Sequence, residues 1–344
     1  GIALLEEVHR RGLGLSSFVS AGNRADVSGN DLIQYWYEDP DTDVILMYLE
    51  SFGNPRKFTR IARRTALVKP VVVVKGGRHT ASTLPAGHAV PAARIPDATA
   101  DALFRQAGVI RVDTATELLD VALLLVTRPL PDGDRVAVVG NSESLGVLTH
   151  DACLTSSLRP HPPVDLTTVA TVEDFRSAVA SALADENTDA VLVNAIPPVS
   201  PDGTTAPWTA GELAHALRAV AHQAAKPVAV THLALDGLPG ALLDVDGEGG
   251  RAGRIPAYPS AERAVRALAE AVRYARWRRE AERPGRIPQF EDVHEASART
   301  QVTALLGVYE QRQTPPGPGP RGMLLGDADA SRLLARYGIH VRPA

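Results

Sequence analysis

Cysteine is nearly absent from this sequence: Cys153 is the sole cysteine among 344 residues. A single thiol excludes both a disulfide framework and a cysteine-rich metal site, and we predict no metal site in the chain. An excess of one charge is also missing, because 36 Lys and Arg stand against 40 Asp and Glu, for a net charge of −4. This balance argues against partners such as nucleic acid or a membrane surface.

Long hydrophobic runs are lacking as well. No stretch approaches 18 apolar residues and no secretory signal is recognised, so we expect a cytoplasmic protein. The hydrophobic residues that are present make up 44% of the sequence, which is enough for substantial cores. The length exceeds that of one ordinary domain, and two domains are therefore expected.

Apolar, β-branched runs alternate with amphipathic helical patterns over most of the sequence. The strands that we expect are residues 16–20, 44–49, 71–75, 109–112, 135–139, 190–195 and 228–231. Such alternation is typical of βαβ units around a parallel sheet. A Pro- and Gly-containing turn at 129–133 indicates a boundary. We predict an α/β fold with two consecutive flavodoxin-like domains with parallel sheets, residues 1–130 and 131–282.

The two ends of the sequence differ from the middle. Residues 283–322 are predicted to be a linker with one helix near 292–311, because the stretch at 314–320 is too rich in Pro and Gly to pack. A helix and the beginning of a strand follow, so we expect 323–344 to start another domain. The first helix opens at Gly1 without an initiator methionine. We therefore expect a fragment, with a strand preceding Gly1 whose absence would leave an edge or gap.

A carboxylate and a histidine stand out in the first half. Ligands bind outside the carboxyl ends of parallel strands, and Glu50 directly follows the apolar strand 44–49. His88 lies in an irregular run rich in Pro and Ala, which we predict to be a mobile loop. A glutamate hydrogen-bonded to one ring nitrogen would leave the other nitrogen nucleophilic, so that it could accept a phosphoryl group. The same sequence patterns would also arise if His88 were an exposed loop histidine and Glu50 a surface acid, neither with a functional role.

Two polar loops follow strands and are candidate anion sites. The first reads Ser20-Ala-Gly-Asn-Arg-Ala-Asp26, and Gly22, Asn23 and Asp26 could offer backbone N–H groups to an anion or merely form a turn. The second reads Gly140-Asn-Ser-Glu-Ser-Leu-Gly146 and leads into a helix. The free N–H groups at a helix N-terminus attract phosphate, so Asn141, Ser142 and Gly146 are predicted to bind it.

Together these motifs resemble the succinyl-CoA synthetase superfamily, and within it the NDP-forming (ADP-forming) acyl-CoA synthetases. The strongest match is Phe104-Arg-Gln-Ala-Gly-Val-Ile-Arg111. Tyr48-Leu-Glu-Ser-Phe52 is close to the family's Tyr-Leu-Glu-Gly-Phe, and the loop ending at Asp26 is close to Ser-Val-Gly-Asn-Lys-Ala-Asp. His88 matches the position of the histidine that is phosphorylated in the family.

The resemblance implies succinyl-CoA ligase-like domains and an acid–thiol ligase activity. Acyl-CoA, ADP and phosphate would be interconverted with acid, CoA and ATP through phosphorylated His88, which Glu50 would orient. Helix N-termini at Gly1 and Gly146 would stabilise the phosphoryl charge, and the loop with Gly22 would approach CoA or phosphate. CoA and ADP or ATP with Mg²⁺ would be bound mainly by CoA-binding and ATP-grasp domains outside this chain, of which residues 323–344 resemble a beginning. The other partner would be a small-molecule acyl substrate, and a homo-oligomer is compatible with the family.

Some residues depart from the family pattern and favour a second interpretation. Glu143 and Ser144 replace two central glycines of the phosphate loop, the Thr-Gly that follows the family's histidine is missing after His88, and Pro162 replaces an asparagine. Similar regions are fused to GCN5-type protein lysine acetyltransferases, where they regulate without synthetase turnover. The alternative function is thus a catalytically silent regulatory region. Under either interpretation, we expect this chain alone to be inactive as a synthetase.

Overall fold

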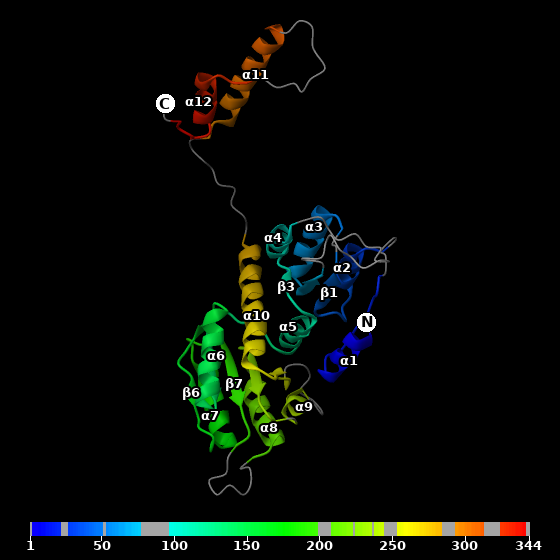
Figure 1. Ribbon diagram of the computed structural model, residues 1–344, viewed down its shortest axis with the longest axis vertical. Helices are drawn as coiled ribbons and strands as arrows, with labels where there is room; N and C mark the ends of the chain where they lie inside the picture. Colours follow the sequence, from blue (N-terminus) through cyan, green and yellow to red (C-terminus); the bar gives the residue numbers. More distant parts are fainter. Residues whose placement is uncertain are drawn as a thin grey trace. The chain divides into compact units, whose positions relative to one another are not determined.

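Two compact units make up the chain, Gly1–Arg283 and Pro284–Ala344. The computed structural model describes residues 2–21, 27–50, 53–76, 96–198, 208–222, 224–235, 237–243, 253–283, 293–312 and 324–341. The first unit contains two β-sheets with helices around and between them (Figure 1). Every strand pair in these two sheets is parallel. The predicted α/β class with parallel sheets is therefore confirmed.

Three strands form the first sheet, in the order β1-β2-β3. Their bounds are Ile45–Leu49, Val71–Lys75 and Ile110–Val112. All five residues of β2 are buried, because helices cover both faces of the sheet. One face packs against α2 (Gly29–Glu38), α3 (Pro55–Ala66) and α4 (Asp97–Ala107), and the other against α5 (Ala115–Thr127). Helix α1 (Ile2–Arg10) precedes this sheet in the sequence.

Local sequence signals set the ends of these helices. Asn54 caps α3 by accepting hydrogen bonds from the N–H groups of Arg56 and Lys57. Thr114 and Glu117 form a capping box at the start of α5. Gly108 ends α4 with φ +72, a left-handed conformation that glycine adopts without strain.

The second sheet has the order β5-β4-β7-β8-β9, and β6 also pairs with β4. The bounds are Arg135–Gly140 for β4, Arg159–Pro160 for β5, Val164–Asp165 for β6, Ala190–Ala195 for β7, Val228–His232 for β8 and Ala257–Tyr258 for β9. Strands β5 and β6 occupy the same edge of β4, with Pro162 and Pro163 in the chain between them. This edge is therefore interrupted at its middle.

The helices of the second sheet complete a layered arrangement. Helices α7, α8 and α9 pack on one face of the sheet, while α6 and the long α10 lie on the other. Their bounds are Glu143–Thr155 for α6, Val172–Ala184 for α7, Ala210–Ala221 for α8, Leu238–Leu243 for α9 and Ala261–Glu282 for α10. Val74 of the first sheet and Val138 of the second belong to one buried cluster with residues of α5 and α10. These two helices thus lie between the sheets and share their core (Figure 1).

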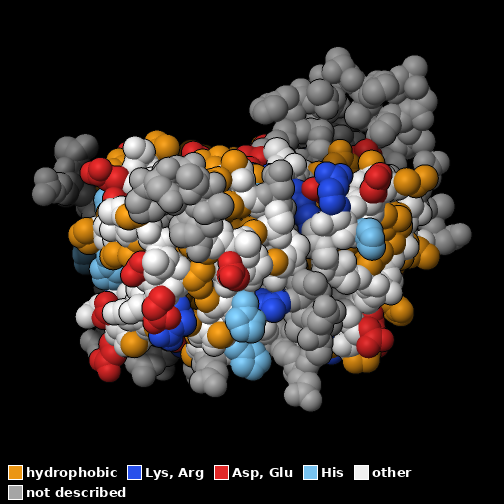
Figure 2. Space-filling model, turned by 90° about the horizontal axis from the view of Figure 1, so that it is seen from below, with side chains coloured by type: hydrophobic (Ala, Val, Ile, Leu, Met, Phe, Trp, Pro, Cys, Tyr) orange, Lys and Arg blue, Asp and Glu red, His pale blue; other side chains and the backbone are white. Residues whose placement is uncertain are grey.

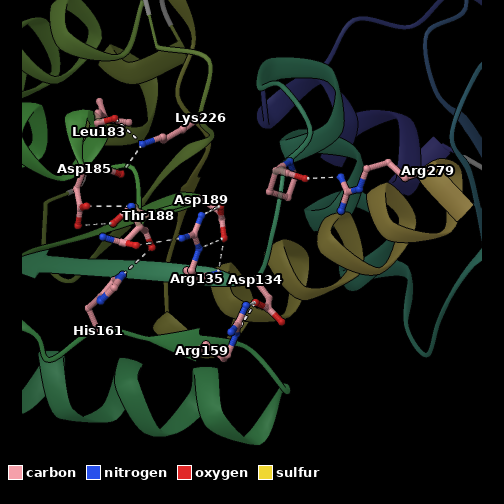
Figure 3. A network of polar contacts seen from close by, with 12 residues as sticks. Asp134, Arg135, Arg159, His161, Leu183, Asp185, Thr188, Asp189, Lys226 and Arg279 are labelled. Atoms are coloured by element: carbon pink, nitrogen blue, oxygen red, sulfur yellow. Dashed lines mark hydrogen bonds and ion pairs between the residues drawn. The ribbon is translucent and has the colours of Figure 1, made fainter.

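A network of ion pairs joins strands at the amino ends of the second sheet (Figure 3). Arg135 of β4 pairs with buried Asp189 at 2.8 Å, and Arg159 of β5 pairs with Asp134 at 2.5 Å. Lys226 donates to the carbonyl oxygens of Leu183 and Asp185 at 2.7 Å each. Because ligands bind at the carboxyl ends of parallel strands, this network has a structural role.

The described part of the second unit contains the helices α11 (Glu295–Arg312) and α12 (Asp327–Ala335). An antiparallel bridge joins Val293 to Tyr337. The helix predicted near 292–311 and the helix predicted within 323–344 are both present. The beginning of a strand predicted after the second helix is not observed, because residues 338–341 have no regular structure.

Other elements of the first unit also differ from the sequence predictions. Residues 16–20 are not a strand, since no strand in the described part of the chain pairs with them. Conversely, β5 and α9 were not predicted, because Pro160 and Pro239-Gly240 disfavour a strand and a helix respectively.

The surface is of mixed charge. On the face seen in Figure 2, acidic and basic side chains are interspersed among hydrophobic and neutral ones. This agrees with the small net charge. Among the described helices, none combines the length and the apolar composition needed to cross a membrane.

Candidate functional site

The junction of β4 and α6 carries three of the predicted phosphate-binding residues. Ser142 is the N-cap of α6, and its hydroxyl oxygen accepts a hydrogen bond from the N–H of Leu145 at 3.4 Å. Glu143 and Ser144 are exposed in the first turn, so the acidic side chain stands beside the positive end of the helix dipole. The turn can present backbone N–H groups to an anion, while Glu143 opposes an anion there.

Asn141 is fully buried and its side chain holds the junction in place. The side-chain nitrogen donates to the carbonyl oxygen of Ile196 at 3.0 Å, and the side-chain oxygen accepts from the N–H of Ile196 at 2.9 Å. The backbone N–H of Asn141 donates to the carbonyl oxygen of Asn194 at 3.3 Å. These bonds tie the loop after β4 to the end of β7, so the observed contacts of Asn141 are structural.

A buried polar network that the sequence did not predict supports the same junction. Asn194, at the end of β7, donates to the hydroxyl of Thr149 at 2.9 Å and accepts a hydrogen bond from Thr231 of β8. Thr149 in turn donates to the carbonyl oxygen of Leu145 at 2.7 Å. The only sequence signal was an asparagine near the end of the otherwise apolar run Ala190–Ala195. Because each of these polar groups is paired, the network fixes the start of α6 against the sheet.

Two glycines allow this close packing. A Cβ atom at Gly140 would lie 2.7 Å from both the Cβ and the carbonyl oxygen of Asn194. A Cβ atom at Gly146 would lie 3.1 Å from Cβ of Pro163. The observed role of Gly146 is therefore to let α6 approach the chain before β6.

The carboxyl ends of β1 and β2 form the second part of the candidate site. Glu50 follows β1 directly and is half-buried. Its Cγ atom is 3.7 Å from the position that a Cβ of Gly76 would occupy, and the N–H of Gly76 donates to the carbonyl oxygen of Leu49 at 2.8 Å. The segment that carries His88 therefore leaves β2 beside the Glu50 side chain. Lys75 ends β2 with only 4% of its surface exposed, which places a buried lysine side chain at the same end of the sheet.

The remaining predicted site residues are Gly1, Gly22, Asn23, Asp26 and His88. All five lie outside the described residues, so their roles stay predictions. Likewise, the predicted loop around His88 falls on residues 77–95, which the structure does not describe. Within the described ranges, no group of three or more His, Cys, Asp or Glu side chains is arranged to hold a metal ion.

Helix α1 is held in place by a buried carboxylate. Arg11, which follows α1, pairs with Asp120 of α5 at 2.5 Å, and Arg263 of α10 pairs with the same carboxylate at 2.6 Å. Glu7 accepts a further hydrogen bond from Arg11 at 2.7 Å. The hydroxyl of buried Tyr258 donates to the carbonyl oxygen of Asp120, and burial raises the pKa of this phenol well above its ordinary value. These contacts join α1, α5 and α10.

Comparisons with known proteins agree with this architecture. Residues 1–125 match the model of the succinyl-CoA ligase like flavodoxin domain. The chain is 28% identical over 299 residues to the alpha subunit of acetate–CoA ligase [ADP-forming] I from Pyrococcus furiosus, covering 81% of this chain and 62% of that protein. It is also 28% identical to 4-hydroxybutyrate–CoA ligase [ADP-forming] from Nitrosopumilus maritimus, covering 98% of this chain and 48% of that protein. The chain thus spans about half to three fifths of these relatives.

A solved structure supports the same relationship. The dinucleotide forming acetyl-coenzyme A synthetase 1 of Ca. Korarchaeum cryptofilum, in complex with phosphate and ADP, superposes with a TM-score of 0.71 at 27% identity. The match covers 83% of this chain and 65% of that one. Residues 1–125 therefore match the succinyl-CoA ligase like flavodoxin domain, and the chain as a whole is similar to ADP-forming CoA ligases.

Proposed function

We propose that this chain is a module of an ADP-forming acyl-CoA synthetase that transfers a phosphoryl group through His88. The observation that carries the proposal is the position of Glu50 beside Gly76, where the segment bearing His88 begins. A carboxylate at this place suits the role of orienting a histidine that takes up phosphate. The names of the relatives, which are ADP-forming CoA ligases, support the reaction class.

The proposed reaction has three balanced steps. Phosphate displaces CoA from acyl-CoA and gives an acyl phosphate. A ring nitrogen of His88 then attacks the phosphorus, so that a P–N bond forms while the P–O bond to the carboxylate breaks and the acid leaves. Finally, an oxygen of ADP attacks the phosphohistidine, which yields ATP and restores the imidazole. Glu50 accepts a hydrogen bond from the other ring nitrogen and keeps the attacking nitrogen unprotonated.

The protein would stabilise the phosphoryl charge from two directions. The first turn of α6, capped by Ser142 and packed closely through Gly146, offers backbone N–H groups. Lys75 supplies a positive charge at the end of β2. The N-terminus of the helix that begins after Gly1, and the loop with Gly22, Asn23 and Asp26, would face phosphate or CoA. CoA and ADP or ATP with Mg²⁺ would be held mainly by domains beyond this chain.

Among the described residues, Glu143, Ser144 and Pro162 depart from the family pattern and favour the acetyltransferase-linked alternative. A carboxylate at an anion-binding turn weakens phosphate binding, but its side chain is exposed and can turn toward solvent. The relatives named above are ligases and lend this alternative no support.

Labelling with [γ-³²P]ATP and Mg²⁺ tests the proposal in the natural protein. We expect an acid-labile, base-stable phosphate that maps to His88 and disappears in His88→Ala. His161→Ala is the matched control, since His161 lies at the amino end of the second sheet, where its ring is 3.0 Å from the carbonyl oxygen of Asn187. Undiminished label in His88→Ala would refute the proposed phosphohistidine.

A further inference from the structure

Tyr48 is an exposed aromatic residue in a strand that is otherwise covered. Its neighbours in β1, Met47 and Leu49, are buried, whereas Tyr48 is 63% exposed. Glu50 follows two residues later. Because side chains alternate between the two faces of a sheet, Tyr48 and Glu50 lie on the same face. The tyrosine therefore stands on the side of the sheet where the proposed function places the orienting carboxylate.

Gly76 is the point on which the two side chains converge. A Cβ atom there would lie 3.0 Å from the hydroxyl oxygen of Tyr48 and 3.7 Å from Cγ of Glu50. The first distance is shorter than an ordinary van der Waals contact, so the missing side chain of glycine leaves room for the hydroxyl. The phenol and the carboxylate are thus neighbours at the carboxyl end of the sheet, where the chain leaves β2.

The first turn of α1 lies on the same side. Ala3 and Leu4 in this turn, together with Tyr48 and Glu50, line a groove of about 1360 Å³. The ion pair with Asp120 holds the end of α1 against α5, which covers this face of the sheet. The tyrosine hydroxyl, the orienting carboxylate and the helix that the proposed function assigns to the phosphoryl group therefore face one accessible space.

Resting on the proposed function, we infer that Tyr48 is a further catalytic residue, whose hydroxyl donates a hydrogen bond to an oxygen of the phosphoryl group during transfer. Negative charge is spread over the outer oxygens of this group, and a positioned donor stabilises it. The phenol keeps its proton, so the bonds that form and break are those given above. An uncharged donor suits this place, because a lysine or arginine would pair with Glu50 and compete with the histidine for the carboxylate.

Tyr48→Phe in the natural protein tests the inference, with the labelling by [γ-³²P]ATP described above followed over time. We expect labelling of His88, and its reversal by added ADP, to slow by about 10- to 100-fold, since the donor stabilises a transition state shared by both directions. With excess ATP the final labelled fraction should match the parent, whereas a folding defect would lower it. Tyr35→Phe is the matched control, because Tyr35 is 59% exposed on α2, which covers the opposite face of the sheet.

Gly76→Ala tests the position of the hydroxyl independently. The added Cβ would push the hydroxyl aside but would meet Cγ of Glu50 only in ordinary contact, at 3.7 Å. It should slow labelling about 3- to 10-fold in the parent and less than about 2-fold in Tyr48→Phe, where the nearest ring atom would be Cζ at 3.5 Å. An effect that Gly76→Ala exerts only through the segment after β2 would be the same in both backgrounds.

The outcomes separate this inference from the proposed function. Labelling of Tyr48→Phe at the parent rate would overturn the inference and leave the phosphohistidine intact. Equal effects of Gly76→Ala with and without the hydroxyl would also overturn it, since the alanine would then act through another group. A parent protein that takes up no label at His88 would overturn the proposed function, and the inference with it.

Discussion

Arg11 and Asp120 form an ion pair of 2.5 Å although they are 109 residues apart in the sequence. The Asp120 side chain is 4% exposed and also pairs with Arg263. The pair fixes α1 on the face of the first sheet that α5 covers. On the proposed function, it thereby also positions the N-terminus of a phosphate-facing helix.

Asp120→Ala should therefore destabilise the protein strongly. Two partly buried guanidinium groups would lose their shared carboxylate, and breaking such a pair costs about 3–5 kcal/mol. Urea unfolding measures the change in free energy. Asp151→Ala on the exposed face of α6 is the matched control and should stay within about 0.5 kcal/mol of the parent. Equal effects of the two substitutions would contradict the assigned role of Asp120.

Stability should depend on Asp189 at acidic pH. The hydrogen bonds from Arg135 lower the pKa of this carboxyl below its ordinary value. A lowered folded-state pKa gives stability that is present above the unfolded pKa and is lost as pH falls through the folded pKa. The contribution should therefore fade below about pH 4. The urea concentration at which half of the protein is unfolded should be measured between pH 2.5 and 7. As the pH is lowered, it should fall less steeply in Asp189→Asn than in the parent protein. Parallel curves for the two proteins would argue against the ion pair.

Gly108→Ala should destabilise more than an ordinary glycine replacement. Gly108 has φ +72, and a Cβ there would lie 2.4 Å from ring atoms of Trp277. Left-handed strain and the clash together should cost roughly 2–4 kcal/mol. Gly14→Ala is the control, because nothing lies within 4 Å of its added Cβ. Thermal unfolding of the two variants separates them, and an unchanged Tm for Gly108→Ala would count against the observed packing.

Cys153 should be inert in the folded protein. It is fully buried in α6, and burial raises the pKa of its thiol to about 12. Ellman's reagent at pH 8 should therefore detect one thiol only after unfolding in guanidinium chloride. Rapid reaction of the native protein would mean that α6 opens readily from the sheet.

Glu50→Gln should slow His88 phosphorylation without unfolding the protein. The amide keeps the shape of the side chain but loses the charge that would orient and polarise the imidazole. A decrease of about 10- to 100-fold is typical when an outer carboxylate that orients a histidine is replaced. The rate of labelling with ATP measures the phosphorylation of His88, and circular dichroism shows whether the variant stays folded. An unchanged rate would leave Glu50 without its proposed role.

Local signals predicted the fold well but not the contacts of the site. The apolar strands Val71–Lys75 and Ala190–Ala195 were predicted with correct ends, because their patterns are contained in the segments themselves. The hydrogen bonds between Asn141 and Ile196 join residues 55 positions apart, and no local pattern encodes such a pairing. The predicted strand at 16–20 failed for a similar reason, since a strand needs a neighbour as well as a propensity.

The forked edge of the second sheet has a consequence for self-association. Strands β5 and β6 form this edge, and Pro160, Pro162 and Pro163 lie within its seven residues from Arg159 to Asp165. Prolines have no N–H to offer to an incoming strand, and the break between β5 and β6 interrupts the row of acceptors. Intermolecular sheet extension leading to fibrils or precipitates is thus discouraged at this border. Replacing these prolines is expected to lower the solubility of the protein.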